Sequence, residues 1–183
     1  MRSLSSLGQL PASIPLRADA AVEFHAARLL LLLLLCGKDG RIDGLTKMAK
    51  LDFFVRYPQF FERACAELQV PVQISADLAV ESTMIRYHYG PWDERYYHIL
   101  AYLRSRALVR VEIVGKAYEL MLTDLGQLMA KKIAAEPSYS QLVEYMGLVR
   151  ERLGGKNGTQ LKNLVYKLFD KEIAQLPRGE VIR

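Results

Sequence analysis

The apolar positions of this chain begin with an unbroken block of seven leucines, from Leu29 to Leu35. Arg28 precedes the block and the glycine-containing, charged segment 37–41 follows it closely, so the block is shorter than the roughly 20 apolar residues that a membrane-crossing helix needs. A helix that is hydrophobic nearly all round is covered on several sides by other elements. The pattern therefore predicts a buried core helix over residues 20–36 and no membrane partner.

Neither a signal peptide nor a lipoprotein signal fits this block. It begins late, follows an acidic stretch that contains His25, and is not followed by a small-residue cleavage pattern. Leu34 and Leu35 precede Cys36, where a lipidated cysteine needs small residues. We therefore expect a cytoplasmic protein in which Cys36 and Cys65 are buried, reduced thiols, since neither has metal or redox spacing.

Helical spacing of apolar residues resumes after Gly44, in a stripe made of Leu45, Met48, Ala49 and Leu51. Asp43 is expected to cap this second helix, and residues 41–43 to form a short extended piece before it. Pro58 limits the helix, because the residue before a proline is pushed out of helical geometry, and a third helix is predicted over 59–68. Residues 70–90 mix β-branched and short polar residues, which predicts irregular chain with one strand at 84–89.

The segment 89–133 has the most informative pattern, which reads helix, strand, turn, strand, helix. The first helix is predicted over 92–106, with Pro91 at or just before its first turn. Its inner face is expected to consist of the apolar positions that recur at helical spacing, namely Tyr96, Ile99, Leu100, Leu103 and Ala107.

Alternating residues over 109–114 and 118–122, joined at Gly115, predict an antiparallel hairpin. Thr123 is expected to cap the following helix, and Gly126 to let that helix approach the returning strand closely. The spacing Tyr118-x-Leu120-x-Leu122-Thr123-x-x-Gly126 resembles the end of a winged-helix domain. We therefore predict a mainly α fold with a small β-hairpin, a winged-helix domain with extra C-terminal helices.

In a winged helix, the helix before the hairpin usually enters the major groove of DNA. The face of 92–106 opposite its apolar stripe, together with the hairpin tip, supplies the candidate DNA-binding residues, which are Arg95, His98, Tyr102, Arg106 and Lys116. Glu94 opposes phosphate, and winged helices also serve as protein–protein modules. Contact with double-stranded DNA and an ordinary solvated face both fit this pattern.

Two amphipathic helices are predicted after the hairpin, over 139–153 and 159–176. The first places Leu142, Tyr145, Met146, Val149 and Leu153 on one face. The second supplies candidate partner-binding residues, which are Leu161, Leu164, Leu168 and Phe169. Packing against the leucine helix and docking on a partner both fit these faces. The expected organisation is a loose arm over 1–18, the winged-helix domain over 19–136 with an insertion near 57–90, and a helical extension over 137–183.

Composition and charge change this picture little. The chain has 183 residues, of which 51% are hydrophobic and 25% charged, which suits one domain or one domain with an appendage. Its net charge of +5 is compatible with a polyanion partner. His25, His88 and His98 do not have metal-ligand spacing. The stretch GGKNGT at 154–159 has no lysine followed by serine or threonine after its final glycine, so it predicts a turn between two helices and not a phosphate loop. We therefore expect no enzyme, no metal and no cofactor.

Two stretches, GKDGRIDGLTKMAKLDFFVRYPQFFERA and MIRYHYGPWDERYYHILAYLRSRALV, together with GTQLKNLVYKLF near the C-terminus, resemble the middle components of bacterial ABC-three-component defence systems of the Lamassu kind. The resemblance implies an adaptor that joins an SMC/Rad50-like ABC ATPase to an effector, often a nuclease, in an antiphage complex that senses foreign DNA. The resemblance does not assign a function to any individual residue of this chain. The alternative is a free-standing winged-helix transcription regulator, which would dimerise on a palindromic operator.

Overall fold

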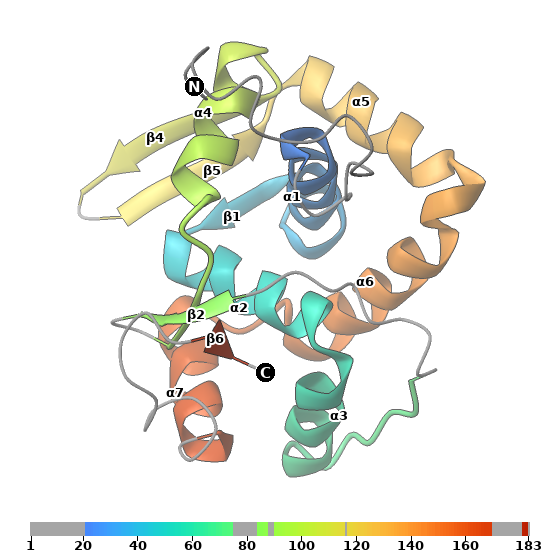
Figure 1. Cartoon of the computed structure of the whole chain (residues 1–183), viewed down its shortest axis with the longest axis vertical. Helices are drawn as coiled ribbons and strands as arrows, with labels where there is room; N and C mark the ends of the chain where they lie inside the picture. The colour runs from blue at the N-terminus through green and yellow to red at the C-terminus, as the bar shows by residue number, and fades with distance from the viewer. Residues whose placement is uncertain (1–20, 75–83, 88–89, 116, 170–180, 183) are drawn as a thin grey trace, which may run out of the picture.

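The leucine-rich helix α1 (Val22–Cys36) runs through the middle of the molecule, as the computed structural model shows (Figure 1). Residues 21–74, 84–87, 90–115, 117–169 and 181–182 are described. The side chains of Leu29 to Leu33 are at most 3% exposed, because α1 is in contact with helices and strands on several sides. The prediction of a buried core helix is confirmed. Among the described residues, no helix is long and apolar enough to cross a membrane.

The elements around α1 alternate between helices and short strands. In chain order they are β1 (Arg41–Asp43), α2 (Leu45–Arg56), α3 (Pro58–Glu67), β2 (Met84–Tyr87), β3 (Gly90–Trp92), α4 (Tyr96–Ser105), β4 (Val109–Val114), β5 (Ala117–Leu122), α5 (Asp124–Ala135), a 3-10 turn (Pro137–Tyr139), α6 (Ser140–Leu153), α7 (Gly158–Leu168) and β6 (Val181–Ile182). The fold is mainly helical with small antiparallel sheets, as expected.

The predicted hairpin is confirmed, and β1 adds a third strand to it. The strand order is β1-β5-β4. Leu120 of the central strand β5 is paired with Ile42 of β1 on one side and with Val111 of β4 on the other. Leu120 is buried against α1, whereas Ile113 near the hairpin tip is 69% exposed. The apolar face of the hairpin therefore continues past the core into solvent. The sequence did not predict the second sheet, of order β3-β2-β6.

Two predicted helix starts were wrong. Asp43 does not cap α2, because Gly44 occupies the cap position with a φ of 95° and no side-chain cap bond, while the Asp43 carboxylate pairs with Arg41. The helix predicted over 92–106 begins only at Tyr96, because residues 90–92 pair with β2 as strand β3. Ala107 is exposed and lies beyond the helix, so it does not belong to the inner face.

The start of α5 follows the prediction. The Gly126 N–H donates to the Thr123 hydroxyl at 3.0 Å, which caps the helix. A Cβ on Gly126 would lie 1.9 Å from the carbonyl oxygen of Leu108, so only glycine fits here. The close approach is confirmed, but it is made to the residue before β4 and not to the returning strand β5.

The two C-terminal helices share one hydrophobic core with the rest of the described chain. Helix α6 packs on α1 and α2, and all five residues of its predicted apolar face are buried. Helix α7 packs mainly on α2 and α3, and not mainly on the leucine helix, which was one of the two uses left open for its apolar face. Asn157 and Gln160 form a reciprocal capping box at its start. The helix predicted over 159–176 ends at Leu168, with Phe169 as its C-cap, and residues 170–176, like the arm over 1–18, lie outside the described residues.

Candidate functional site

Buried charged side chains gather where α1, α2 and the start of α4 meet. Arg28 donates through Nε and Nη2 to the two carboxylate oxygens of Asp52, at 2.8 and 3.2 Å. The Tyr96 hydroxyl donates to Asp52 at 2.7 Å, and Arg56 Nη1 lies 3.5 Å from the same oxygen. Asp52 is fully buried and Arg28 is 1% exposed. This carboxylate therefore holds together residues that come from three helices.

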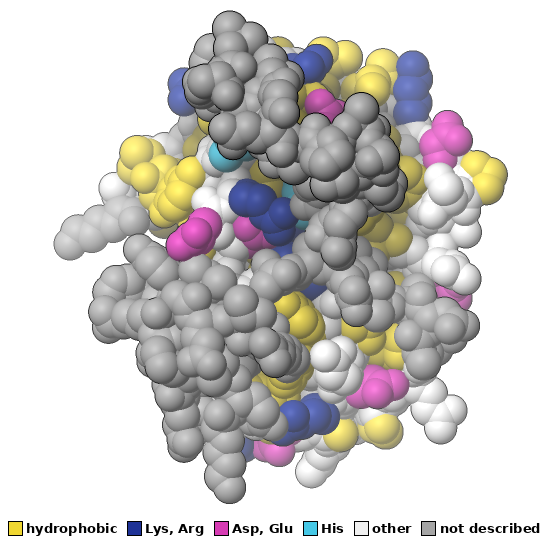
Figure 2. All heavy atoms as spheres, in the orientation of Figure 1, with side chains coloured by type: hydrophobic (Ala, Val, Ile, Leu, Met, Phe, Trp, Pro, Cys, Tyr) yellow, Lys and Arg dark blue, Asp and Glu magenta, His cyan; other side chains and the backbone are white. Residues whose placement is uncertain are grey.

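A second buried carboxylate extends the cluster toward the surface. Asp93 precedes α4 and accepts from Arg56 Nη1 at 2.9 Å. Arg95 donates to both Asp93 oxygens, at 2.9 and 2.8 Å. The nitrogen atoms of the His25 ring lie 2.8 Å from Arg28 and 2.7 Å from Arg95. Charged side chains of both signs are visible near the centre of the face shown in Figure 2. We call Arg28, Asp52, Arg56, Asp93 and Arg95 the ion cluster.

The arginines keep both carboxylates ionised. Burial alone would raise the pKa of Asp52, but the positive charges of Arg28 and Arg56 hold this pKa below its ordinary value. Burial also acts on Asp93, where the hydrogen bonds from Arg95 and the charge of Arg56 lower the pKa to about 2. Because neither group carries a proton near neutral pH, the ion cluster is suited to holding α1, α2 and α4 together rather than to proton transfer.

The candidate DNA-binding residues do not form one free basic face. Arg95 points into the ion cluster and its side chain is 38% exposed. Tyr102 donates to Glu23 of α1 at 3.4 Å, and the Arg106 guanidinium stacks 4.6 Å from the Tyr102 ring. His98 is exposed. The structure thus brings Tyr102 and Arg106 together and turns Arg95 inward, while the candidate Lys116 lies outside the described residues.

The candidate partner-binding residues of α7 lie in the core of the chain. Leu161 and Phe169 are fully buried and Leu164 is nearly so, while Leu168 is half-buried. The Phe169 ring lies 4.7 Å from the ring of Phe60 in α3. Of the two uses that the sequence left open for this stripe, the structure therefore shows packing within the chain.

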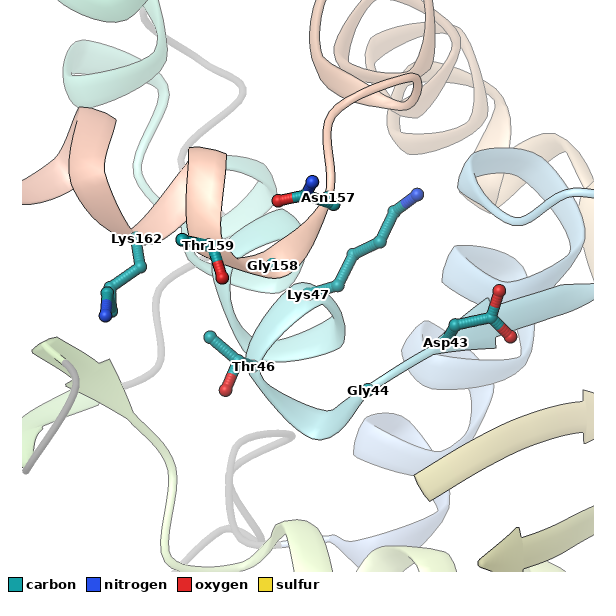
Figure 3. Close-up of a pocket in the computed structure, with 8 residues that line it drawn as sticks. All are labelled: Asp43, Gly44, Thr46, Lys47, Asn157, Gly158, Thr159 and Lys162. Carbon is teal, nitrogen blue, oxygen red and sulfur yellow. The ribbon is translucent and has the colours of Figure 1, made fainter. Parts of the chain in front are cut away.

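A pocket of about 370 Å³ lies where the first turns of α2 and α7 meet. It is lined by Asp43, Gly44, Thr46, Lys47, Asn157, Gly158, Thr159 and Lys162 (Figure 3). Lys47 and Lys162 extend in different directions, and Lys47 donates to the carbonyl of Gly154 at 2.8 Å. The Asp43 carboxylate lies in the lining beside these lysines, and the Asn157 side chain already accepts from the Gln160 N–H at the start of α7, so the pocket is not specialised for one sign of charge. The glycine-containing turn predicted at 154–159 supplies one side of it.

Lys50 is a buried cation outside the ion cluster. It is 1% exposed, and its Nζ donates to the carbonyl of Pro91 in β3 at 2.9 Å. Burial, together with the nearby charge of Lys162, lowers the pKa of Lys50 to about 7. This bond therefore ties α2 to the second sheet through a group that titrates near neutral pH.

Raising the pH from about 7 to about 9 is expected to stabilise the fold. The folded pKa of Lys50 lies below its unfolded value of 10.5, so the unfolded chain binds more protons between these values and stability rises with pH, by at most about 1.4 kcal/mol per unit. Urea unfolding at a series of pH values below 9 measures this dependence of stability on pH. Above about pH 9 the buried thiol of Cys36, whose pKa burial raises to about 12, makes stability fall with pH instead.

Lys50→Met is expected to remove this pH-dependent gain, whereas Lys131→Met, at an exposed position of α5, is expected to retain it. An equal slope in the two variants would contradict the assignment to Lys50.

Sequence reasoning missed the ion cluster, because its members are spread over residues that looked like ordinary surface charges. The one available signal is that Asp52 and Arg56, four residues apart, fall within the apolar stretch of α2. The cysteines were predicted correctly, since Cys36 and Cys65 are free and buried. Among the described residues, no group of three or more His, Cys, Asp or Glu side chains is placed to hold a metal ion.

Comparisons with known proteins found no matching family model, no matching curated protein and no matching solved structure.

Proposed function

We propose that this chain is a non-enzymatic adaptor subunit of an antiphage defence complex, which joins an SMC-like ABC ATPase to a nuclease-type effector. The resemblance of its sequence to the middle components of ABC-three-component systems suggests the complex. The observation that carries the adaptor role is the outer face of α5, where Leu125, Leu128 and Met129 are 47%, 51% and 36% exposed.

Helix α5 is apolar on two sides. Gly126 and Ala130 are buried on its inner side, which contacts α1. Leu125, Leu128 and Met129 are spaced as neighbours along one outer stripe, since residues three and four apart lie together on a helix. Contiguous exposed apolar side chains are typical of a protein–protein contact. Because the residues of α7 that were candidates for partner binding lie in the core, the proposal assigns docking of the ATPase to this stripe on α5.

We further infer that β1, α2, α4 and the β4–β5 hairpin correspond to a winged-helix unit. The strand order β1-β5-β4 and the position of α4 directly before the hairpin support this inference. The described part of the hairpin tip exposes Ile113, Val114 and Tyr118, and Figure 2 shows hydrophobic side chains gathered where this hairpin ends in Figure 1. These described residues of the tip are apolar, which favours contact with protein, while Lys116 at the turn lies outside the described residues.

The second candidate is a free-standing winged-helix transcription regulator. The observation that favours it is the exposed side of α4, where His98 and Arg106 are available for DNA. A regulator of this kind binds one operator far more tightly than unrelated DNA, whereas an adaptor that contacts only phosphates binds all sequences alike. Affinities for genomic fragments at fixed salt separate the two, and a strong operator preference would contradict the adaptor proposal.

Replacing Leu125 and Leu128 together by lysine is expected to release the ATPase from this chain. Both side chains are about half exposed, so the fold should lose less than about 0.5 kcal/mol for each change, while burial of a few apolar anchors usually dominates binding. The measurement is co-purification with an SMC-like ATPase encoded beside this chain. Tyr97→Lys, at a 60% exposed apolar position on α4, is the matched control and should retain the ATPase. Retention by the double variant, or neighbouring genes that encode no such ATPase, would contradict the proposal.

A further inference from the structure

Strand β4 is an edge of its sheet, whose order is β1-β5-β4. The backbone hydrogen bonds of β5 show which residues of β4 direct their N–H and C=O groups away from β5. The Leu122 N–H donates to the carbonyl of Gly40, and the Tyr118 carbonyl accepts from the N–H of Gly44, at 2.9 and 2.7 Å. Both groups therefore point toward the β1 side and away from β4.

In an antiparallel ladder, opposed residues direct their backbone groups either toward each other or both away. Val109 is opposite Leu122, and Ile113 is opposite Tyr118. The backbone N–H and C=O groups of Val109 and Ile113 therefore point to the open edge of the sheet. Because direction alternates along a strand, those of Val111, midway between them, point the same way. Within the described part of the chain, no hydrogen bond reaches Val111 or Ile113 from outside their own sheet.

The sequence of this edge is self-complementary. Val109-Arg110-Val111-Glu112-Ile113 has an apolar residue at its centre and both ends, with opposite charges at equal distances from the centre. A second β4 running in the opposite direction would therefore set arginine against glutamate twice. Cross-strand pairs of opposite charge stabilise a sheet and like charges destabilise it.

We propose that β4 pairs with β4 of a second copy of this chain, antiparallel and about a two-fold axis at Val111. In this register, Val111 of each copy exchanges both backbone hydrogen bonds with Val111 of the other. Val109 faces Ile113 of the second copy, and Arg110 faces Glu112 of the second copy. The two sheets become one continuous sheet, and the contact is isologous, as in most homodimers.

Burial and charge select this register over its neighbours. A shift of one residue breaks the match between outward backbone groups, and a shift of two sets Arg110 against Arg110 or Glu112 against Glu112. Ile113, 69% exposed in one copy, gains an apolar neighbour in the dimer. The side chains of Arg110 and Glu112, 64% and 47% exposed and 3.7 Å apart within one strand, are placed to exchange partners between copies.

The opposite use of edge charges is to prevent association, and it predicts a monomer. Sedimentation equilibrium of the purified full chain decides between the two. The expected species has twice the chain mass of 20.8 kDa. A monomer at every concentration up to about 1 mM, where even weak non-covalent dimers form, would overturn the proposal.

Charge exchange tests the register. Arg110→Glu and Glu112→Arg each place like charges opposite one another, so each variant alone is expected to be monomeric. The double variant Arg110→Glu/Glu112→Arg restores opposite charges and is expected to dimerise. An equimolar mixture of the two single variants sets an acidic strand against a basic one and is expected to form a heterodimer.

This mixture separates pairing between copies from an effect on the fold, because only a contact between copies can be restored by mixing two folded monomers. Lys131→Glu, a charge reversal at an exposed position of α5, is the control and should leave the dimer intact. A dimer that survives both single variants, or a mixture that stays monomeric, would overturn the proposal.

Discussion

The Asp52→Asn variant is expected to lose about 3–5 kcal/mol of unfolding free energy, the cost of breaking a buried ion pair from one side. Asp52 is fully buried, and its carboxylate neutralises Arg28, which is 1% exposed. Asparagine keeps the shape but removes the charge and one of the two acceptor oxygens. The guanidinium of Arg28 then stays buried without this counter-charge, which is far more costly than losing an exposed pair.

Urea unfolding measures this loss, with Asp43→Asn as its matched control. The Asp43 side chain is 58% exposed and pairs with Arg41 at the surface, so its replacement is expected to cost less than about 1 kcal/mol. If the two variants were equally stable, the ion cluster would not hold α1 and α2 together.

Acid is expected to act on the same carboxylates. The folded pKa values of Asp52 and Asp93 lie below their unfolded value of 3.8. Their contributions to the free energy of unfolding are therefore complete above pH 3.8 and are lost as the pH falls through the folded values. For Asp93 this loss extends down to about pH 2. Circular dichroism between about pH 5 and pH 2 should therefore show a shallower acid transition in Asp52→Asn than in the wild type.

The Gly126→Ala variant is expected to destabilise the fold by about 3 kcal/mol, the upper end of the usual cost of overpacking. The added methyl group would lie 1.9 Å from the carbonyl oxygen of Leu108, and this neighbour is backbone that cannot rotate away. Helix α5 must therefore shift off the start of β4, which also strains the cap that Thr123 makes on the Gly126 N–H.

Gly147→Ala is the matched control for this substitution. Gly147 lies in the middle of α6, is exposed, and has open space around an added Cβ. The same change is expected there to stabilise the fold by about 0.5–1 kcal/mol, because alanine loses less backbone entropy than glycine in a helix. Thermal unfolding of both variants compares the effects, and a Gly126→Ala variant as stable as wild type would contradict the close approach.

Most of the elements could be predicted from local pattern. Seven adjacent leucines cannot face water without a large cost, so burial of α1 followed from composition alone. The period-two pattern of β4 and β5 and the 3.6-residue pattern of α6 likewise depend on residues close together in the chain. The capping by Thr123 was equally local, because the cap and the N–H that it accepts from are three residues apart.

The element boundaries that were predicted wrongly depend on residues far away in the sequence. Residues 90–92 look like the approach to a helix, yet Pro91 lies in a strand whose carbonyl accepts from Lys50, 41 residues earlier. Asp93 is fixed just before α4 by Arg56, 37 residues earlier. A proline suits the first turn of a helix and also an edge strand, so contacts of this kind decide where the elements begin.

The ion cluster also depends on contacts between residues that are far apart in the sequence. Apolar periodicity specified which faces turn inward, because burying an apolar side chain is favourable whatever covers it. A buried charge is tolerated only where an opposite charge meets it with good geometry. Asp52 finds that charge in Arg28, 24 residues earlier on another helix. Burial of the leucines could therefore be predicted from the sequence alone. Burial of Asp52 could not, because the cost of removing its carboxylate from water is offset only by Arg28, which the packing of α1 against α2 brings to it.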